Sequence, residues 1–263
     1  RIPTAAFVKV TTKKDIQRVA VKFGYPFLLK ARTDAYDGRG NALIKSETDI
    51  DEGLKKLEGR ALYVEKFVPF IKELAVVVVR SPKNEVRTYP VVQTFHVNNI
   101  CDVVVAPAQV SPSVAKRAQS LAKKTMNKLK GAGVFGIEMF MTKKGQVLIN
   151  EIAPRVHNSG HFTIEGCETS QFEQHIRAIT GLPLGSVDMS SKVSVMKNIL
   201  GSKDGGGFPS GLENALKIRG VSVHMYGKQK SRLDRKMGHI TAVGNSVKEC
   251  LSKVTKASNG IQL

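Results

Sequence analysis

Two glutamates stand at equal distances from a short dipeptide near the middle of the chain. Glu138 precedes Lys144-Gly145 by six residues, and Glu151 follows it by six. If this dipeptide is a two-residue hairpin turn, the glutamates lie opposite one another on one face, with Cβ atoms ~5 Å apart. Ile149 then faces Phe140 on that side, so the carboxylates are partly shielded from water and need a cation or a shared proton. Because Mg²⁺ takes carboxylate oxygens and leaves positions for phosphate and water, the pair predicts a magnesium site.

An exposed hairpin is the alternative interpretation of the same pattern. In that case the two glutamates pair with nearby lysines and bind no metal. Asn150 would add an amide oxygen to a metal site only if its strand bulges, because regular alternation sends it to the opposite face.

A second group of residues could meet phosphate. Lys30 ends the apolar run Phe27-Leu28-Leu29, and a charge in that position must be paired or reach an open site. The loop Tyr36-Asp37-Gly38-Arg39-Gly40 follows it, and the backbone N–H groups of glycines can wrap an anion. Phosphate binding is one interpretation of this loop. An ordinary hairpin loop is the other, because Asp-Gly is a common turn sequence.

A dense set of hydrogen-bond donors follows Glu151. It consists of Arg155, His157, Asn158, Ser159 and His161. Such donors beside a metal carboxylate suit an anion or a polar small molecule. The spacing of the two histidines would also allow zinc binding on a helix. Gly160 is a poor helix residue, and no further cysteine or histidine stands at a convincing spacing, so the sequence favours the first interpretation.

The composition narrows the class of partner. The net charge is +19, from 41 Lys and Arg against 22 Asp and Glu, which favours a nucleotide, a sugar phosphate or a nucleic acid, although scattered lysines can also form an ordinary solvated surface. Nucleic acid is the least favoured, because aromatic residues make up 6% of the chain and Trp is absent. No apolar run approaches bilayer length, so we expect no membrane partner. The three cysteines, Cys101, Cys167 and Cys250, lack paired spacing and indicate reduced thiols and a cytoplasmic location.

The hydrophobic pattern predicts a mixed α/β (α+β) chain. Strands are predicted at residues 5–10, 26–32, 41–45, 61–66, 74–80, 85–92, 102–106, 135–142, 146–152, 222–226 and 239–243. Helices are predicted at residues 112–130 and 170–180, and after the capping residues Thr12, Thr48 and Ser246. The strand at residues 74–80 is nearly all valine, as expected for a strand that is buried on both faces.

Four motifs together resemble an ATP-grasp enzyme, and more specifically carboxyaminoimidazole ribonucleotide synthase. They are residues 36–40, 136–140, 150–161 and 235–239, and the resemblance extends over nearly the whole chain to Val243. It is strongest to the form that is fused with a second purine enzyme in fungi and plants. It implies a small α/β lid subdomain at residues 1–69, a larger antiparallel-sheet subdomain at 70–200 and a small β-rich region at 201–263. The N-terminal nucleotide-fold-like domain of the family is not in this sequence, and we expect the full-length protein to be a homo-oligomer.

The resemblance assigns a role to each matching residue. It implies ATP binding by Lys30, Gly38, Gly40, Glu65, Lys66, Val68 and Glu73. It implies Mg²⁺ binding, or Mn²⁺ binding, by Glu138 and Glu151. It implies contacts with bicarbonate and aminoimidazole ribonucleotide for Tyr36, Asp37, Arg39, Arg155, His157, Asn158, Lys228 and Arg235, with the loop at residues 36–40 closing over phosphate.

The implied reaction joins bicarbonate to the exocyclic amine of aminoimidazole ribonucleotide. ATP phosphorylates bicarbonate to carboxyphosphate. The amine then reacts either with carboxyphosphate itself or with the carbon dioxide that it releases. The sequence departs from the family at Leu233-Asp234, where Pro-Gly is usual, so Arg235 could be aimed differently. Without the N-terminal domain we expect weak nucleotide binding and poor turnover. Another ATP-grasp ligase and a basic nucleic-acid-binding module are the alternative functions.

Overall fold

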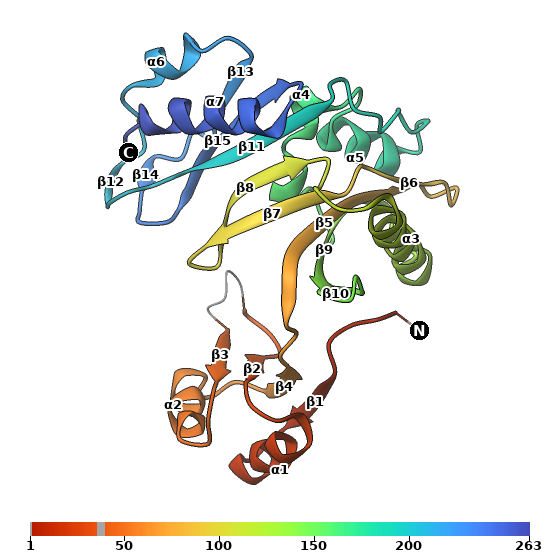
Figure 1. Cartoon of the computed structure of the whole chain (residues 1–263), viewed down its shortest axis with the longest axis vertical. Coiled ribbons are helices and arrows are strands. Elements are labelled where there is room, and N and C mark those ends of the chain that lie inside the picture. Colours follow the sequence, from red (N-terminus) through yellow and green to blue (C-terminus); the bar gives the residue numbers. More distant parts are fainter. Residues whose placement is uncertain (1, 36–39) are drawn as a thin grey trace. The chain divides into compact units, whose positions relative to one another are not determined.

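The computed structural model describes residues 2–35 and 40–263. The chain forms two compact units, one of residues 3–71 and one of residues 72–263 together with Ile2 (Figure 1). Helices and strands are mixed in both units, which confirms the predicted fold class. The expected boundaries after residues 69 and 200 stay predictions.

The first unit is a four-stranded antiparallel sheet with two helices. Its strand order is β1 (Phe7–Val10), β4 (Leu62–Lys66), β2 (Phe27–Ala31) and β3 (Asn41–Ile44). Helices α1 (Lys13–Phe23) and α2 (Asp49–Lys56) pack on the face that carries Phe27 and Leu29. Ile16 of α1 and Ile50 of α2 are both fully buried there, so one apolar core holds the unit together.

The two helix starts of this unit differ in their caps. Thr12 accepts a hydrogen bond from the backbone of Asp15, whose carboxylate accepts one from the Thr12 backbone, so the predicted capping box is confirmed. The predicted cap at Thr48 is wrong, because Thr48 has helical backbone angles and makes no capping hydrogen bond. The carboxylate of Asp49 instead accepts from the backbone N–H groups of Lys45 and Ser46.

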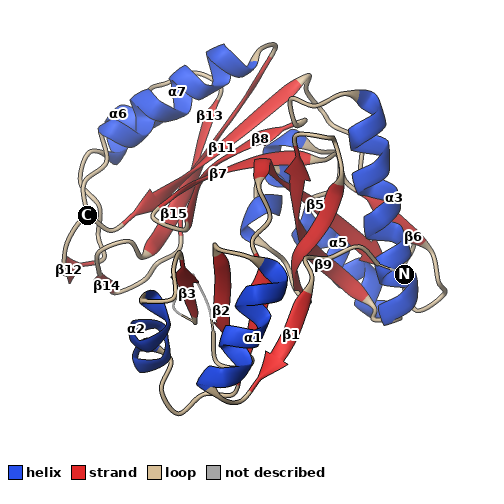
Figure 2. Cartoon of the chain, turned by 60° about the horizontal axis from the view of Figure 1, so that its bottom comes forward, coloured by secondary structure: helices blue, strands red, loops and turns tan. Residues whose placement is uncertain are grey.

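The second unit is built on a nine-stranded sheet (Figure 2). Its order is β10 (Val147–Ala153), β9 (Gly133–Thr142), β5 (Phe70–Arg80), β7 (Val92–Val97), β8 (Ile100–Ala106), β11 (Val193–Leu200), β15 (Lys236–Gly244) and β13 (Val221–Met225), with β6 (Val86–Thr88) also paired to β5. The short strands β12 (Gly205–Gly206) and β14 (Lys230–Ser231) form a separate pair.

Helices cover the sheet on both faces. Helix α3 (Pro112–Leu129) packs on one face of β5 and β9, and α4 (Thr163–Gly166) and α5 (Gln171–Thr180) lie on the other. Residues 74–79 of β5 are 0–1% exposed, which confirms the predicted strand buried on both faces. At the far end, α6 (Leu212–Leu216) and α7 (Val247–Asn259) cover β11, β15 and β13.

Two strands differ from the expected pattern. The single strand expected at residues 85–92 is wrong: β6 and β7 are separate, and Pro90 lies between them, where the ring removes a backbone donor. The sequence analysis does not single out β11, although it is an interior strand of the large sheet. Its alternating residues 193–196 are an available signal for a strand.

The cap difference yields a matched pair of variants. Thr12→Ala removes a side-chain acceptor from the α1 N-terminus and should lower the free energy of unfolding by about 1 kcal/mol. Thr48→Ala removes no capping bond, so its effect should stay within about 0.5 kcal/mol. Urea unfolding followed by circular dichroism compares the two variants. Equal losses would show that the Thr12 cap contributes nothing of its own.

Candidate functional site in the large sheet

Glu138 and Glu151 lie directly opposite one another on β9 and β10. The pairing agrees with the prediction, but the expected turn is wrong. Met141 pairs with Val147, and the Thr142 N–H donates to the Gln146 carbonyl at 3.0 Å, so the hairpin loop consists of the three residues 143–145 and not of two, with Gly145 at φ +72°. A bulge at Asn150 then shifts the register back by one residue. As a further correction, Phe140 pairs with Leu148 and not with Ile149.

The bulge sets Asn150 and Glu151 together opposite Glu138. The side chain of Glu138 is only 21% exposed, so the alternative of an exposed glutamate paired with a lysine is wrong for this residue. Burial, followed by the negative charge of Glu151, raises the pKa of Glu138. A divalent cation would relieve both effects, and two carboxylates plus an amide are a donor set that Mg²⁺ accepts.

His157 contacts this pair from the segment that follows β10. Its Nε2 lies 3.6 Å from Glu138 Oε1, and its Nδ1 lies 2.9 Å from Ser159 Oγ. A Cβ atom on Gly136 of β9 would stand 2.4 Å from the His157 Cβ, so the close approach requires glycine there. Burial lowers the pKa of His157 to about 4, and the imidazole is therefore neutral at neutral pH.

His161 begins a column of stacked imidazole rings. Its ring centroid lies 4.8 Å from that of His239, which lies 4.5 Å from that of His224. His224 Nε2 is 2.5 Å from Glu165 Oε1, and Tyr226 Oη is 2.9 Å from His239 Nδ1. Burial lowers the pKa of His161 to about 4 and that of His239 to about 3.

These histidines do not form a metal centre. Within the described ranges, no three His, Cys, Asp or Glu side chains gather as metal ligands would. The zinc alternative for His157 and His161 is therefore unsupported. The segment between them is a single 3-10 turn at Asn158–Gly160, and not the α-helix that a zinc pair four residues apart would need.

Asn158 is held by a second asparagine. Its side-chain amide exchanges two hydrogen bonds, of 2.8 and 2.9 Å, with the amide of Asn198 on β11. Asn198 is 2% exposed and also donates to the Cys101 carbonyl, so its orientation is fixed.

Glu73 lies on β5, beside the carboxylate pair in the sheet order. Its Oε2 is 2.9 Å from His96 Nδ1 on β7. Burial lowers the pKa of His96, but the hydrogen bond and charge of Glu73 together raise it above its ordinary value. Glu73 also raises the pKa of Glu138, and the positive charge of Lys236 opposes this shift.

The predicted cationic residues Lys228 and Arg235 lie in the late loop, the segment of residues 226–235 between β13 and β15. Lys228 Nζ donates to the Lys236 carbonyl at 2.5 Å and stands 5.6 Å from the centre of the Tyr226 ring. Arg235 Nη1 donates to the Lys230 carbonyl at 2.8 Å. Burial, then the charges of Arg235 and Lys236, lower the pKa of Lys228. Positive charge is thus concentrated in this loop, which favours an anionic ligand.

The backbone at Leu233-Asp234, where Pro-Gly is expected, is held by hydrogen bonds. Asp234 has φ +64°, a left-handed conformation that glycine adopts freely and aspartate tolerates. Its N–H donates to the Gly201 carbonyl at 2.9 Å, and the N–H of Gly201 donates to the Arg235 carbonyl at 2.8 Å. This pair of bonds fixes the backbone of Arg235.

The ATP residues implied for residues 1–69 lie in the first unit. Lys30 Nζ is 3.2 Å from Glu65 Oε1, with the two side chains 16% and 14% exposed, and 5.8 Å from the centre of the Tyr63 ring. The buried charge of Lys30 is therefore paired. Gly40 accepts a hydrogen bond from Ala31, and a Cβ on it would collide with Ala35.

The remaining implied nucleotide residues follow β4. Lys66 is exposed at the end of β4, and the Val68 carbonyl accepts from the Phe70 N–H at 2.8 Å. Tyr36, Asp37, Gly38 and Arg39, with the phosphate-loop prediction that rests on them, lie outside the described residues.

The sequence and the fold match known proteins. Residues 1–172 match the ATP-grasp domain, and residues 194–253 match the phosphoribosylaminoimidazole carboxylase C-terminal domain. A crystal structure of carboxyaminoimidazole ribonucleotide synthase from Aspergillus clavatus, complexed with ATP, is 42% identical at a TM-score of 0.89 and covers 98% of this chain and 68% of its own. The chain belongs to the ATP-grasp family of carboxyaminoimidazole ribonucleotide synthases.

Other members of the family agree. The phosphoribosylaminoimidazole carboxylase of Ogataea methanolica is 48% identical over 94% of this chain and 47% of its own length. The N5-carboxyaminoimidazole ribonucleotide synthase of Bacillus subtilis is 38% identical over 95% of this chain and 65% of its own. A second Aspergillus clavatus structure, in complex with ADP and 5-aminoimidazole ribonucleotide, has a TM-score of 0.90 at 39% identity and covers 98% of this chain and 69% of its own. The chain spans about half the length of the fungal relative.

Four residues in or beside this candidate site are not singled out by the sequence analysis: His96, Gln171, Asn198 and Lys236. Lys236 follows Arg235 directly, which is a usable signal. Asn198 is a polar residue inside an apolar strand, and such a residue must find a partner. His96 and Gln171 carry no comparable local signal.

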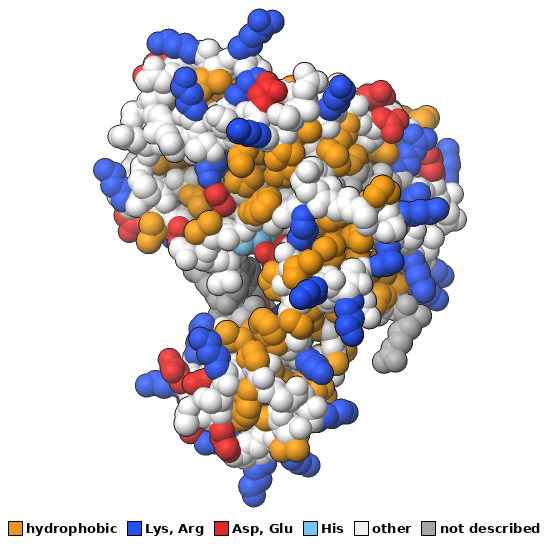
Figure 3. Space-filling view, in the orientation of Figure 1, with side chains coloured by type: hydrophobic (Ala, Val, Ile, Leu, Met, Phe, Trp, Pro, Cys, Tyr) orange, Lys and Arg blue, Asp and Glu red, His pale blue; other side chains and the backbone are white. Residues whose placement is uncertain are grey.

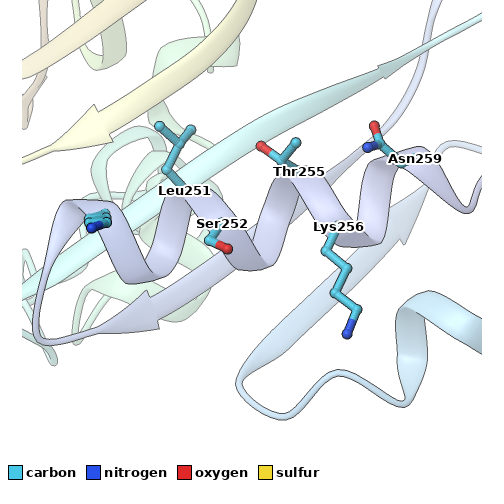
Figure 4. A pocket seen from close by; sticks show the side chains of 6 residues that line it. Leu251, Ser252, Thr255, Lys256 and Asn259 are labelled. Atoms are coloured by element: carbon cyan, nitrogen blue, oxygen red, sulfur yellow. The ribbon is translucent and has the colours of Figure 1, made fainter.

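A surface hollow on α7 is unrelated to the site. It is lined by Lys248, Leu251, Ser252, Thr255, Lys256 and Asn259, all from one helix (Figure 4). None of the predicted site residues lines it.

The pKa of His239 predicts a loss of stability in acid. Its pKa is lowered from 6.5 to about 3, so the ring is neutral in both folded and unfolded states above pH 6.5. As the pH falls from 6.5 toward 3, His239 becomes protonated in the unfolded state but stays neutral in the folded state. The free energy of unfolding therefore decreases. Between about pH 7.5 and about pH 5 this loss is about 2 kcal/mol.

The variant His239→Phe keeps a ring in the stack and removes the titrating group. Over the same pH interval the parent should lose about 2 kcal/mol more of its free energy of unfolding than the variant, as measured by urea unfolding. Parallel losses in the two proteins would contradict the lowered pKa of His239.

Proposed function

We propose that this chain carries the centre for ATP-dependent carboxylation of aminoimidazole ribonucleotide with bicarbonate. The observation that supports this most is the opposed pair Glu138 and Glu151, with neutral His157 beside it and the fixed amide of Asn158 close by along the chain. The pair offers a divalent-cation site, and the following segment offers donors for an anion. The Aspergillus clavatus relatives bind ATP, ADP and 5-aminoimidazole ribonucleotide.

The proposed roles follow from the chemistry of each group. Glu138 and Glu151 hold Mg²⁺, or Mn²⁺, and the bound metal offsets negative charge on the transferring phosphoryl group. The residues proposed to bind ATP are Lys30, Gly38, Gly40, Glu65, Lys66, Val68 and Glu73. Because Lys30 is paired with Glu65, contact with a phosphate requires this ion pair to open or to be shared.

In the proposed reaction, an oxygen of bicarbonate attacks the γ-phosphorus and ADP leaves. The amine of the ribonucleotide then forms a bond to the carbon, and phosphate leaves. Arg155, His157 and Asn158 bind bicarbonate and the imidazole. Lys228 and Arg235 bind the ribonucleotide phosphate. Tyr36, Asp37 and Arg39 belong to the loop proposed to close over phosphate and substrate.

The polypeptide supplies no nucleophile in this proposal. The three cysteines are buried, and burial raises the pKa values of Cys101 and Cys167 to about 12. These thiols are therefore protonated at neutral pH. We also propose a cytoplasmic location and, for the full-length protein, a homo-oligomer. In residues 2–35 and 40–263, no helix is long and apolar enough to cross a bilayer.

The alternative of a nucleic-acid-binding module finds little support on the one face of the molecule that Figure 3 shows. Lys and Arg are scattered over the face shown in Figure 3, among hydrophobic and neutral side chains, and do not form one continuous stripe. A nucleic-acid groove needs such a continuous basic track.

The metal pair can be tested by calorimetry. Glu138→Gln and Glu151→Gln should each weaken Mg²⁺-dependent ATP binding about tenfold or more, because each removes one charged ligand. Each should also raise the free energy of unfolding in the absence of metal, since one like charge is gone. Glu213→Gln, an exposed change on α6, is the matched control and should alter neither quantity. Unchanged Mg²⁺-dependent ATP binding in both site variants would refute the metal assignment.

The reaction itself is tested by ADP release. Release should require both aminoimidazole ribonucleotide and bicarbonate. Release that is equally fast with another amine substrate would favour a different ATP-grasp ligase.

A further inference from the structure

Gln171 is the first residue of α5 and is fully buried. Its side-chain Oε1 accepts from the His157 N–H at 2.9 Å, and its Nε2 lies 2.8 Å from the His157 carbonyl oxygen. The same Nε2 lies 2.9 Å from His161 Nδ1. The Gln171 backbone N–H in turn donates to Thr163 Oγ1 at 2.9 Å. One side chain therefore joins both histidines of the segment that follows β10.

The backbone of His157 decides which way round the Gln171 amide lies. An N–H must face Oε1 and a carbonyl must face Nε2, so the opposite orientation would set donor against donor and acceptor against acceptor. The amide nitrogen Nε2 has two N–H donors and cannot accept a hydrogen bond. Its second N–H therefore donates to His161 Nδ1. Nδ1 must then be the unprotonated nitrogen of His161, and the proton of the neutral ring is on Nε2.

Close packing also restricts the positions of the Gln171 amide and the His161 ring. A Cβ on Gly160 would stand 2.4 Å from Gln171 Oε1 and 2.8 Å from Val77, so glycine at 160 makes room for the amide. The His161 ring is stacked between Phe172, at 5.6 Å, and His239, at 4.8 Å. The ring therefore cannot turn to offer the other nitrogen without breaking both stacks.

Charged and titratable neighbours also favour the neutral form of the His161 ring. After burial itself, the cationic or titratable groups Lys236, His224 and Arg155 lower the pKa of His161 to about 4. Stacked His239 is also neutral at neutral pH, because its pKa is lowered to about 3.

We propose that Gln171 is a positioning residue of the site, which fixes the backbone at His157 and the Nε2–H tautomer of His161. A carboxylate at this position would offer an acceptor to Nδ1 and favour the imidazolium, and an apolar side chain would leave the tautomer unset. The link to turnover rests on the proposed function, but the tautomer itself does not.

Gln174 provides a matched control on the same helix. It is also fully buried, and its amide makes the same type of double bond to the backbone, with the N–H and carbonyl of Gly185, each at 2.8 Å. The bonds of its amide go to Gly185, outside the segment of His157 and His161. Gln174→Met and Gln171→Met should therefore cost similar stability through lost buried hydrogen bonds.

The test is long-range ¹H–¹⁵N NMR of the histidine rings in the full chain at neutral pH, without ligand. The parent and Gln174→Met should show His161 neutral, with Nδ1 unprotonated. Gln171→Glu should show both nitrogens protonated, and Gln171→Met should show a mixture of tautomers. An Nδ1-protonated ring in the parent, or an unchanged His161 spectrum in both Gln171 variants, overturns the proposal.

Turnover separates this proposal from the proposed function. If the parent releases ADP with bicarbonate and ribonucleotide, Gln171→Met should lower kcat about tenfold or more, since small misplacement of binding groups is costly, while Gln174→Met stays near the parent. A turnover rate as high as that of Gln174→Met would overturn the positioning role. If the parent releases no ADP but the tautomers are as expected, the assignment of Gln171 to the His161 tautomer stands independently of the proposed function.

Discussion

Two negative charges held opposite one another across β9 and β10 are the constraint that organises the large unit. The Glu138 side chain is only 21% exposed, so water screens its repulsion from the exposed Glu151 incompletely. The fold holds the two together because the hairpin ladder and the packed core beneath it fix both strands. The nearby histidines are kept neutral by burial, and Lys236 supplies positive charge. The proposed site, which has to attract both a cation and an anion, would therefore lie on a rigid sheet.

The sequence predicts this pair correctly through two errors that cancel. A regular ladder from a two-residue turn gives the same opposition as a three-residue loop followed by a one-residue bulge. The two arrangements differ in the position of Asn150, because only the bulge places Asn150 together with Glu151 opposite Glu138. Loop length depends on backbone angles at Gly145 that a Lys-Gly dipeptide does not specify.

Local patterns predict most strands and all the described α-helices except the short α4 and α6, since burial periodicity and capping residues are local properties. The Thr12 box forms as expected, whereas Thr48 makes no capping bond and the Asp49 carboxylate accepts from Lys45 and Ser46, which precede the helix. The partners of His157, Asn158 and His161 are not predictable in this way. Gln171 and Asn198 reach them from α5 and β11, and only the three-dimensional fold brings these elements beside residues 157–161. The motif at residues 157–161 contains the side chains proposed to bind ligands, whereas the residues that hold them in place are distant in the sequence.

Asp234 gives the late loop a property that a glycine would not. The left-handed backbone is retained, but a carboxylate now stands in a segment that also contains Lys228, Arg235 and Lys236. At physiological ionic strength, charges within about 8 Å of one another still interact, so this carboxylate offsets part of the local positive potential. An arriving anion is then drawn in less by the general field and depends more on direct hydrogen bonds from individual cations. Selectivity among anions of equal charge would therefore depend on their shape. Ions such as chloride, which accept hydrogen bonds without directional preference, would compete poorly for this loop.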